Sequence, residues 1–287
     1  MPVDSATLTL TLLALVAFAS NSILTRLAIG GAAIDAASFT AVRLASGAVA
    51  LSLAVRASTG SWSPLRTRDV AGPLALIIYA VPFSLAYVRI GAAVGALVLF
   101  GAVQITMVAY GIWRGERPRP LAWAGLMIAS SGLAALTLRS AVRPDPAGVA
   151  LMSVAGAAWG AYSIAGRTSP DPVAANARSF LLSAPLALLF ALFSRGAATV
   201  TTPGVAVALV SGVIASGGGY IVWYRAVRRL AVTQAAVAQL TVPVLAAVGA
   251  GVFLGEPINL RLVMSGAAVL GGVALVLVSR SAAHRRG

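Results

Sequence analysis

Apolar residues fill ten long runs of the chain, and short segments rich in turn-forming and charged residues separate them. A helix needs about 20 mostly apolar residues to cross the hydrocarbon core of a bilayer, and each run is close to that length. The pattern therefore predicts an all-α membrane protein with ten transmembrane helices. The expected spans are 6–25, 36–55, 70–88, 90–113, 120–138, 147–166, 173–194, 203–224, 231–254 and 260–279.

The composition agrees with this class of protein. Of the 287 residues, 59% are hydrophobic and only 10% are charged, and the mean hydropathy is +0.93. A soluble domain is about a quarter charged, and a soluble fold of this size could not cover its surface with so few charges. A lipid bilayer accepts apolar side chains on the outside of the protein, so it is the partner that the composition predicts.

The basic residues indicate a topology and not a nucleic-acid partner. The net charge is +14, and all 21 basic residues are arginines scattered between the apolar runs. With a cytoplasmic N-terminus, 14 arginines fall in the cytoplasmic connections and the C-terminal tail, and 6 fall in the outer connections. Because cytoplasmic loops carry the excess of basic residues, both termini are expected in the cytoplasm. Nucleic-acid binding would need a basic face on a soluble module.

The residues on which most enzymes depend are scarce. The chain has no cysteine, and its single histidine is His284, in the C-terminal tail. All seven acidic residues fall at helix ends or in connections, with Glu116 and Glu256 directly before a following helix. Those two glutamates are interpreted as helix caps or interface residues. We therefore expect no catalytic residue, no metal site and no cofactor, and hence no enzyme.

The two halves of the sequence resemble each other at an offset of 140 to 141 residues. Segment 86–116 aligns with 226–256 without a gap, so that Gly115-Glu116 matches Gly255-Glu256. Each half contains five expected helices, and an odd number places equivalent helices in opposite directions across the membrane. The sequence thus predicts two inverted-topology five-helix repeats, residues 1–142 and 143–287. In transporters of that architecture the substrate site lies near the midplane between the halves.

Several short motifs recur in both halves and resemble a known family. The first helix of each half ends in arginine, as Phe18-Ala-Ser-Asn-Ser-Ile-Leu-Thr-Arg26 and as Trp159-Gly-Ala-Tyr-Ser-Ile-Ala-Gly-Arg167. The most telling segment is Ala235-Ala-Val-Ala-Gln-Leu-Thr-Val-Pro243-Val, which leads to the second Gly-Glu pair. The chain resembles EamA-type members of the drug/metabolite transporter (DMT) superfamily, above all the YddG-type aromatic amino-acid exporters. It departs from the repeat pattern where Val103 stands opposite Pro243 and Phe18 opposite Trp159.

The resemblance implies a multi-pass protein of the bacterial inner (plasma) membrane. Such a protein exports small neutral metabolites, above all amino acids including aromatic ones, by alternating access. Two fused five-helix halves also imply that a monomer suffices. Two alternatives remain open: export of other drugs or hydrophobic metabolites, and a channel-like facilitator whose flux does not saturate.

Polar and aromatic residues form stripes on six of the expected helices, and polar side chains within a bilayer tend to face a cavity. The spans 36–55, 120–138, 173–194 and 260–279 have few such residues and are expected outside as scaffold. The candidate substrate-binding residues are Asn21, Tyr79, Phe83, Gln104, Trp159, Tyr162, Ser163, Tyr220 and Gln239. Alternatively, the two glutamines hydrogen-bond across packed helices, and Tyr87, Trp223 and Tyr224 belong to an interfacial aromatic belt.

If these candidates line the substrate cavity, its wall consists of aromatic, amide and hydroxyl groups and has no charge. Aromatic faces stack on apolar rings and attract an ammonium group, and amides hydrogen-bond both charged ends of an amino acid. A phosphate would instead need a buried arginine or lysine, and none is expected in the middle of the membrane. Since no carboxylate is embedded, we also expect facilitated flux without a carboxylate proton relay.

Overall fold

The computed structural model describes residues 3–61, 70–137, 145–194, 199–255 and 258–279. Within these ranges nine helical segments are long and apolar enough to cross a membrane, and Pro120–Leu136 is a tenth, shorter apolar helix. The only strand-like pairing in the same ranges is an isolated bridge between Ile34 and Val200. The prediction of an all-helical membrane protein is confirmed for the described part of the chain.

The helices follow the apolar runs closely. They are α1 (Ser5–Thr25) continued by the π-helix η1 (Arg26–Gly30), α2 (Ala36–Thr59), α3 (Ala71–Trp113), α4 (Pro120–Thr137), α5 (Pro146–Thr168), α6 (Pro172–Phe193), α7 (Thr202–Val210) continued by the π-helix η3 (Ser211–Gly218) and by α8 (Gly219–Val227), α9 (Val232–Ala238), α10 (Thr241–Leu254) and α11 (Leu260–Val278).

Helix α3 contains two spans, Ala71–Ile90 and Val94–Trp113, and the chain reverses between them. The ring centroid of Tyr79 lies 5.1 Å from that of Trp159. A methyl group on the next residue, Gly160, would lie 3.0 Å from the side chain of Thr106. In a straight helix Tyr79 and Thr106 would be about 40 Å apart, at 1.5 Å per residue. The two spans are therefore antiparallel neighbours, as the two separate apolar runs predict.

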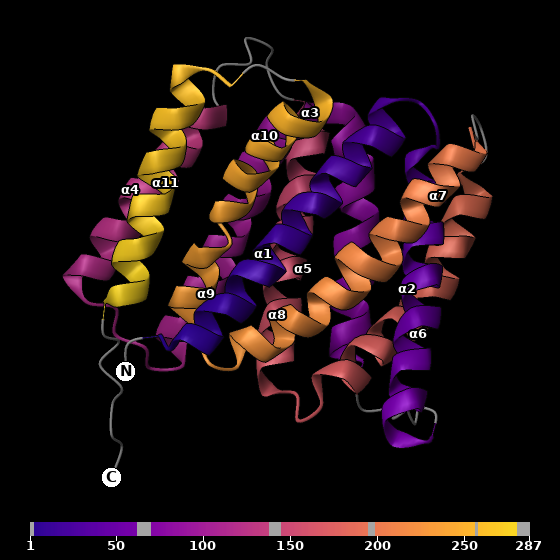
Figure 1. The fold of residues 1–287 in the computed structure, drawn as a ribbon, viewed down its shortest axis with the longest axis horizontal. Helices are drawn as coiled ribbons and strands as arrows, with labels where there is room; N and C mark the ends of the chain where they lie inside the picture. Colours follow the sequence, from indigo (N-terminus) through magenta and orange to yellow (C-terminus); the bar gives the residue numbers. More distant parts are fainter. Residues whose placement is uncertain (1–2, 62–69, 138–144, 195–198, 256–257, 280–287) are drawn as a thin grey trace.

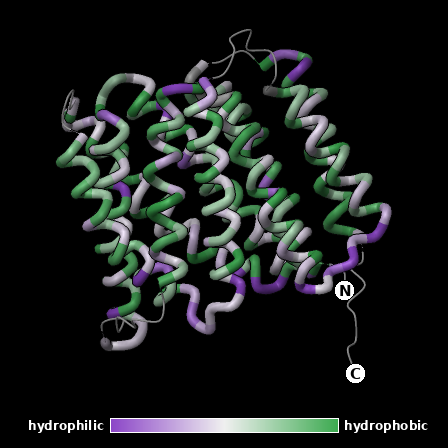
Figure 2. Tube along the Cα trace, turned by 180° about the vertical axis from the view of Figure 1, so that it is seen from behind, coloured by the Kyte–Doolittle hydropathy of each residue, from purple (hydrophilic) through white to green (hydrophobic). Residues whose placement is uncertain are grey.

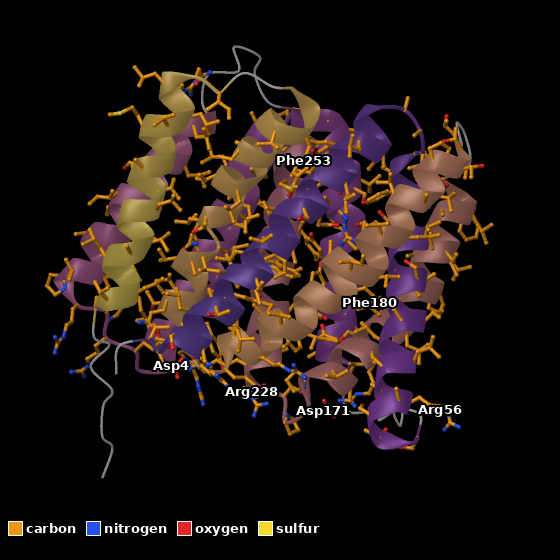
Figure 3. The ribbon with its side chains drawn as sticks, viewed as in Figure 1. Asp4, Arg56, Asp171, Phe180, Arg228 and Phe253 are labelled. Atoms are coloured by element: carbon orange, nitrogen blue, oxygen red, sulfur yellow. The ribbon has the colours of Figure 1, made fainter. Side chains whose placement is uncertain are left out.

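The helices form one bundle in which α1 begins and α11 ends at the same end (Figure 1). The pair α4 and α11 flanks one side of the bundle, and α2 packs on α6 at the other. Hydrophobic residues run along the helices, and hydrophilic ones gather mainly at the two ends of the bundle (Figure 2). Asp4, Arg56, Asp171 and Arg228 all lie at the end where α1 begins (Figure 3).

Acidic residues stand at helix starts because they cap them. Asp4 accepts a hydrogen bond of 2.6 Å from the Thr7 backbone N–H, and Asp35 caps α2 and Asp171 caps α6 in the same way. Hydrogen bonds from Thr7 lower the pKa of the Asp4 carboxyl. Free N–H groups and the helix dipole both favour a carboxylate at this position. These carboxylates therefore have a structural role at the ends of the bundle.

Glycines bring α4 and α11 into close contact. A methyl group on Gly125 would lie 2.6 Å from the Gly272 carbonyl oxygen, and one on Gly272 would lie 2.5 Å from the Gly125 carbonyl oxygen. A methyl group on Gly132 would lie 3.0 Å from the Ser265 carbonyl oxygen. Small residues allow backbones to approach in this way, and van der Waals packing then stabilises the helix pair. Alanine at any of these glycines would push the two helices apart.

Candidate functional site

A cavity of about 220 Å³ lies inside the bundle. Side chains from α1, η1, both spans of α3, α5, α8 and α10 line it, which are the six spans expected to surround it. One further lining residue, Leu136, comes from α4, a helix that was expected to lie outside as scaffold. The full lining is Phe18, Asn21, Ser22, Arg26, Tyr79, Phe83, Tyr87, Gly95, Ala96, Leu99, Phe100, Leu136, Met152, Trp159, Tyr220, Val242, Pro243, Ala246 and Ala247.

Four aromatic rings meet at one end of the cavity and form its floor: Phe18, Tyr79, Trp159 and Tyr220. The ring centroids of Phe18 and Trp159 are 5.2 Å apart in an edge-to-face arrangement. Trp159 lies 4.9 Å from Tyr220, and Phe18 lies 5.7 Å from Tyr220. Aromatic pairs at these separations stabilise one another beyond their buried area. The floor is therefore a fixed aromatic surface with the Phe83 ring beside it, 5.5 Å from Tyr79.

The indole of Trp159 is held from behind by Gln239. The Trp159 Nε1–H donates a 2.6 Å hydrogen bond to Gln239 Oε1, and Gln239 Nε2 donates to Met107 Sδ and to the Ala235 carbonyl. Gln104 donates a 2.6 Å hydrogen bond to the Ala236 carbonyl. Neither glutamine lines the cavity. The structure places both where the alternative interpretation put them, as hydrogen-bonding groups between packed helices.

Two further candidates, Tyr162 and Ser163, lie beneath the floor. The Tyr162 hydroxyl donates a 2.6 Å hydrogen bond to Asn176 Oδ1, and Ser163 Oγ accepts one of 3.0 Å from Trp223 Nε1. Trp223 and Tyr224 are 0% and 1% exposed, so the interpretation of these two as an interfacial belt is wrong. Tyr87 lines the cavity. Of the nine candidates, the structure thus brings Asn21, Tyr79, Phe83, Trp159 and Tyr220 together on the cavity wall.

Asn21 joins α1 to the π-helix η3 beside the cavity. Its Oδ1 accepts a 2.5 Å hydrogen bond from the Ser211 hydroxyl. The backbone hydrogen bonds of a π-helix span one residue more than those of an α-helix. Such helices are rare, and many of those that occur lie at functional sites. Both π-helices adjoin the cavity here, since η1 supplies Arg26 and η3 leads directly into the turn that holds Tyr220. The sequence contains no pattern that predicts either π-helix.

Two expectations about charge, an uncharged cavity wall and no buried arginine in the membrane, are wrong. Arg26 is part of the cavity wall, because η1 extends the lining stripe of α1 by another turn. Arg43 in α2 is only 2% exposed, although no buried arginine was expected in the membrane interior. The signal was present in the sequence, since an ionisable residue within an apolar span is expected to face the interior and to have a function.

Comparisons with known proteins agree with this architecture. Residues 146–278 match the model of the EamA-like transporter family. The chain is 46% identical over 277 residues to the uncharacterized protein PA1977 of Pseudomonas aeruginosa, covering 96% of each chain. The second half of the chain is an EamA-like transporter family domain. EamA-like proteins are membrane transporters of small molecules and not enzymes.

A crystal structure of another protein has the same fold as this chain. It superimposes with a TM-score of 0.83 over 96% of this chain and 99% of the other, at 20% sequence identity. At that identity the likeness concerns the fold alone. The match extends over both halves of the chain, whereas the family model matches the second half.

Beneath the floor of the cavity, the bundle is sealed by contacts between distant segments. Glu116, between α3 and α4, accepts hydrogen bonds from the backbone N–H groups of Val232 and Thr233, at 2.6 and 3.0 Å. The Thr233 hydroxyl donates a third, of 2.8 Å. Glu116 thus caps α9, in the second half of the chain, and not the helix α4 that follows it in sequence. Its counterpart Glu256 lies outside the described residues.

The cavity lies toward the opposite end of the bundle. On α1 its lining runs from Phe18 toward Arg26, and on the second span of α3 it runs from Gly95 to Phe100, directly after the chain reversal. Three crossings precede that reversal, so it lies at the end opposite to the start of α1. Arg26 and Tyr87 at that end are partly exposed, whereas Trp159 and Tyr220 on the floor are 5% and 2% exposed.

Proposed function

We propose that this EamA-like transporter carries small neutral amino acids, including aromatic ones, out of the bacterial cytoplasm. The observation that carries this proposal is the closed aromatic floor beneath a cavity of about 220 Å³. Pockets for drug-sized ligands measure about 300–1,000 Å³, so this volume favours a metabolite of amino-acid size over a larger drug. Amino acids are also the substrates that the resemblance to the YddG-type exporters implies.

The wall chemistry fits a zwitterion with an aromatic or apolar side chain. The faces of Trp159 and Tyr220 offer stacking to a ring and attraction to an ammonium group. Asn21 adds an amide, which can donate to a carboxylate through its NH₂ group while its oxygen is occupied by Ser211. No acidic residue is among the lining residues. We therefore infer facilitated flux without a membrane-embedded proton carrier.

We infer that the two halves are inverted repeats that exchange access to the cavity, and the aromatic floor supports this. At the offset of 141 residues, Phe18 corresponds to Trp159 and Tyr79 corresponds to Tyr220. The contact of Phe18 with Tyr220 then has an equivalent in that of Trp159 with Tyr79, with centroids 5.7 and 5.1 Å apart. Such paired contacts are what a pseudo-twofold axis between the halves would produce, and inverted-repeat transporters bind substrate between their halves.

The scaffold pair α4 and α11 supports the same repeat. A shift of 140 positions relates Gly132 to Gly272 and Gly125 to Ser265. The approach of Gly132 to the Ser265 carbonyl therefore has an equivalent in the approach of Gly272 to the Gly125 carbonyl. With cytoplasmic termini, the sealed end that contains Glu116 faces the cytoplasm and the cavity faces outward. A single chain contains both halves, so a monomer suffices for this mechanism.

Counterflow into proteoliposomes tests the proposed function. Vesicles preloaded with unlabelled tryptophan should accumulate radiolabelled tryptophan transiently and saturably, and other neutral amino acids should compete. Trp159→Ala removes a ring of the floor and should reduce the initial rate at least tenfold, because a fully buried aromatic contributes several kcal/mol of contact. Trp113→Ala is the matched control, since that indole is 77% exposed on the outside of the bundle and should leave counterflow unchanged.

The outcomes separate the rival functions. Uptake that rises linearly with concentration, without counterflow, would establish a channel-like facilitator instead of a carrier. Saturable counterflow that amino acids fail to inhibit would show that the carrier's substrate belongs to another class of metabolite. Uptake that requires a pH gradient and disappears in Glu116→Gln would contradict flux without a carboxylate relay.

A further inference from the structure

Arg43 is a buried charge for which the described fold provides no full set of partners. It lies about 10 Å along α2 from the first residue of that helix, at 1.5 Å per residue, and its side chain is 2% exposed. Its Nε and Nη2 atoms are buried and have no hydrogen-bond partner. A charge in a membrane interior is costly unless it is paired or functional. Since the helix packing leaves two of its donors unused, packing alone does not account for Arg43.

The surroundings of Arg43 connect it to the substrate cavity. Its guanidinium carbon lies 5.8 Å from the centroid of the Tyr79 ring. Among the described groups, those that act on its charge are the phenols of Tyr79 and Tyr220, and no carboxylate is among them. Both tyrosines line the cavity, whereas Arg43 does not. The positive charge therefore lies outside the lining, beside two tyrosines that belong to it.

The lining itself does not compensate this charge. It contains no aspartate or glutamate, and its one charged residue is Arg26, which is also basic. Two cationic side chains thus converge on a cavity whose remaining wall is aromatic, amide and aliphatic. In a site of low dielectric constant, such a field favours a negatively charged group of the substrate. The aromatic faces remain available for an ammonium group or an apolar ring.

We propose that Arg43 is the positioning residue of a carboxylate subsite, acting through Tyr79 and Tyr220. The guanidinium donates toward the phenol oxygens, which orients the phenol O–H groups toward the cavity, where they donate to the substrate carboxylate. Neighbouring charge strengthens such hydrogen bonds. The inference rests on the proposed function and deepens it, because it identifies the carboxylate as the group that the cavity selects.

Paired ligands that differ only in charge test the subsite without requiring transport. The full chain, purified in detergent, is titrated with indole-3-propionate and with its neutral amide, indole-3-propionamide, and thermal stabilisation gives an apparent Kd for each. The wild-type protein should bind the acid about tenfold or more tightly than the amide, as expected for a charge-assisted hydrogen bond. Arg43→Gln should abolish that preference, and Arg43→Lys should retain part of it.

Controls separate positioning from a structural role. If Arg43 had only a structural role, Arg43→Gln would weaken the binding of the acid and of the amide by the same factor. An unchanged preference for the acid in Arg43→Gln therefore overturns the proposal. Tyr79→Phe removes one phenol and should reduce the preference even if Arg43→Gln does not fold. Arg228→Gln, at the far end of the bundle, should preserve it.

The wild-type measurement also separates this inference from the proposed function. An acid that binds no more tightly than the amide, or binding of neither ligand, overturns the carboxylate subsite whatever the transported substrate is. A clear preference for the acid in a protein that shows no tryptophan counterflow would retain the subsite and reject amino-acid transport. Tryptophan counterflow without a preference for the acid would support amino-acid transport and reject the carboxylate subsite.

Discussion

At the scale of single residues, the helical period predicts which side chains share a face but not how deep that face lies. Tyr79, Phe83 and Tyr87 follow one face of the first span of α3, and all three line the cavity. Tyr162 and Ser163 share the face of Trp159 and yet lie beneath the floor. Their depth depends on partners from distant segments, such as Asn176, and no local pattern contains that information.

The hydrogen bond from Trp159 to Gln239 provides the first prediction. Gln239→Leu leaves the buried indole N–H without an acceptor, which should destabilise the protein by about 1–3 kcal/mol and raise the KM for counterflow, since the ring is no longer held in place. Thermal unfolding and concentration-dependent counterflow measure the two effects. Gln104→Leu is the matched control: it also loses a buried hydrogen bond to the backbone, but should leave KM unchanged. An unaltered KM in Gln239→Leu would contradict the positioning role.

At the scale of elements, the apolar runs predict the helices well, because each span must satisfy its own backbone hydrogen bonds in lipid. The run 70–88 and the run 90–113 are two spans even though the helix α3 includes both. The details that were not predicted concern departures from ideal helices. The π-helices η1 and η3 have no sequence signal. Helix η3 lies where the chain packs closely, since a methyl group on Gly212 would meet the Arg43 carbonyl oxygen.

The cap that Glu116 places on α9 provides a prediction about closure. Glu116→Gln weakens three hydrogen bonds at the N-terminus of α9 and removes a favourable interaction of its charge with the helix dipole. The sealed end should then open more often. A cysteine introduced at Ala236, which is 0% exposed, should react severalfold faster with maleimide in Glu116→Gln than in the parent chain. Asp171→Asn, which alters the cap of α6 instead, should leave that rate unchanged.

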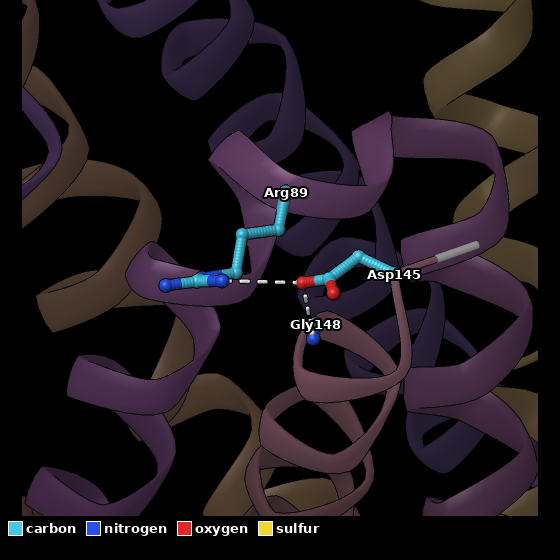
Figure 4. A network of polar contacts seen from close by, with 3 residues as sticks. All are labelled: Arg89, Asp145 and Gly148. Carbon is cyan, nitrogen blue, oxygen red and sulfur yellow. Dashed lines mark hydrogen bonds and ion pairs between the residues drawn. The ribbon is translucent and has the colours of Figure 1, made fainter.

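The connection of α3 to α5 provides a pH-dependent prediction. Asp145 accepts hydrogen bonds from the Gly148 backbone N–H and from Arg89, at 3.0 and 3.2 Å (Figure 4). The Gly148 N–H first, and then Arg89, hold the pKa of Asp145 below its usual 3.8. A lowered pKa in the folded state stabilises the protein above the unfolded value, and this contribution is lost as the pH falls below it. The Tm difference between wild type and Asp145→Asn should therefore shrink from pH 6 toward pH 3. A difference that stays constant would contradict this assignment.

At the scale of the whole molecule, the sequence predicts the number of spans and the six helices around the cavity, but not the charge distribution inside it. The spans follow from composition, and the six helices follow from their polar stripes. Arg43 is the one arginine outside the topology count of 14 and 6, and a pattern along one helix does not show that it packs against Tyr79 from another helix. The position of Arg43 within an apolar span indicates that it faces the interior, but its neighbours Tyr79 and Tyr220 are known only from the assembly of α2, α3 and α8.

The orientation of the assembled bundle provides the last prediction, and the absence of cysteine makes it simple to test. Ser58 is exposed near the end of α2, on the side of Arg56, and Ser194 is the exposed C-cap of α6, at the opposite end of the bundle. If both termini are cytoplasmic, a membrane-impermeant maleimide added to intact bacterial cells should label Ser194→Cys and not Ser58→Cys. After permeabilisation it should label both. The reverse pattern in intact cells would place the termini outside, and the cavity would then face the cytoplasm.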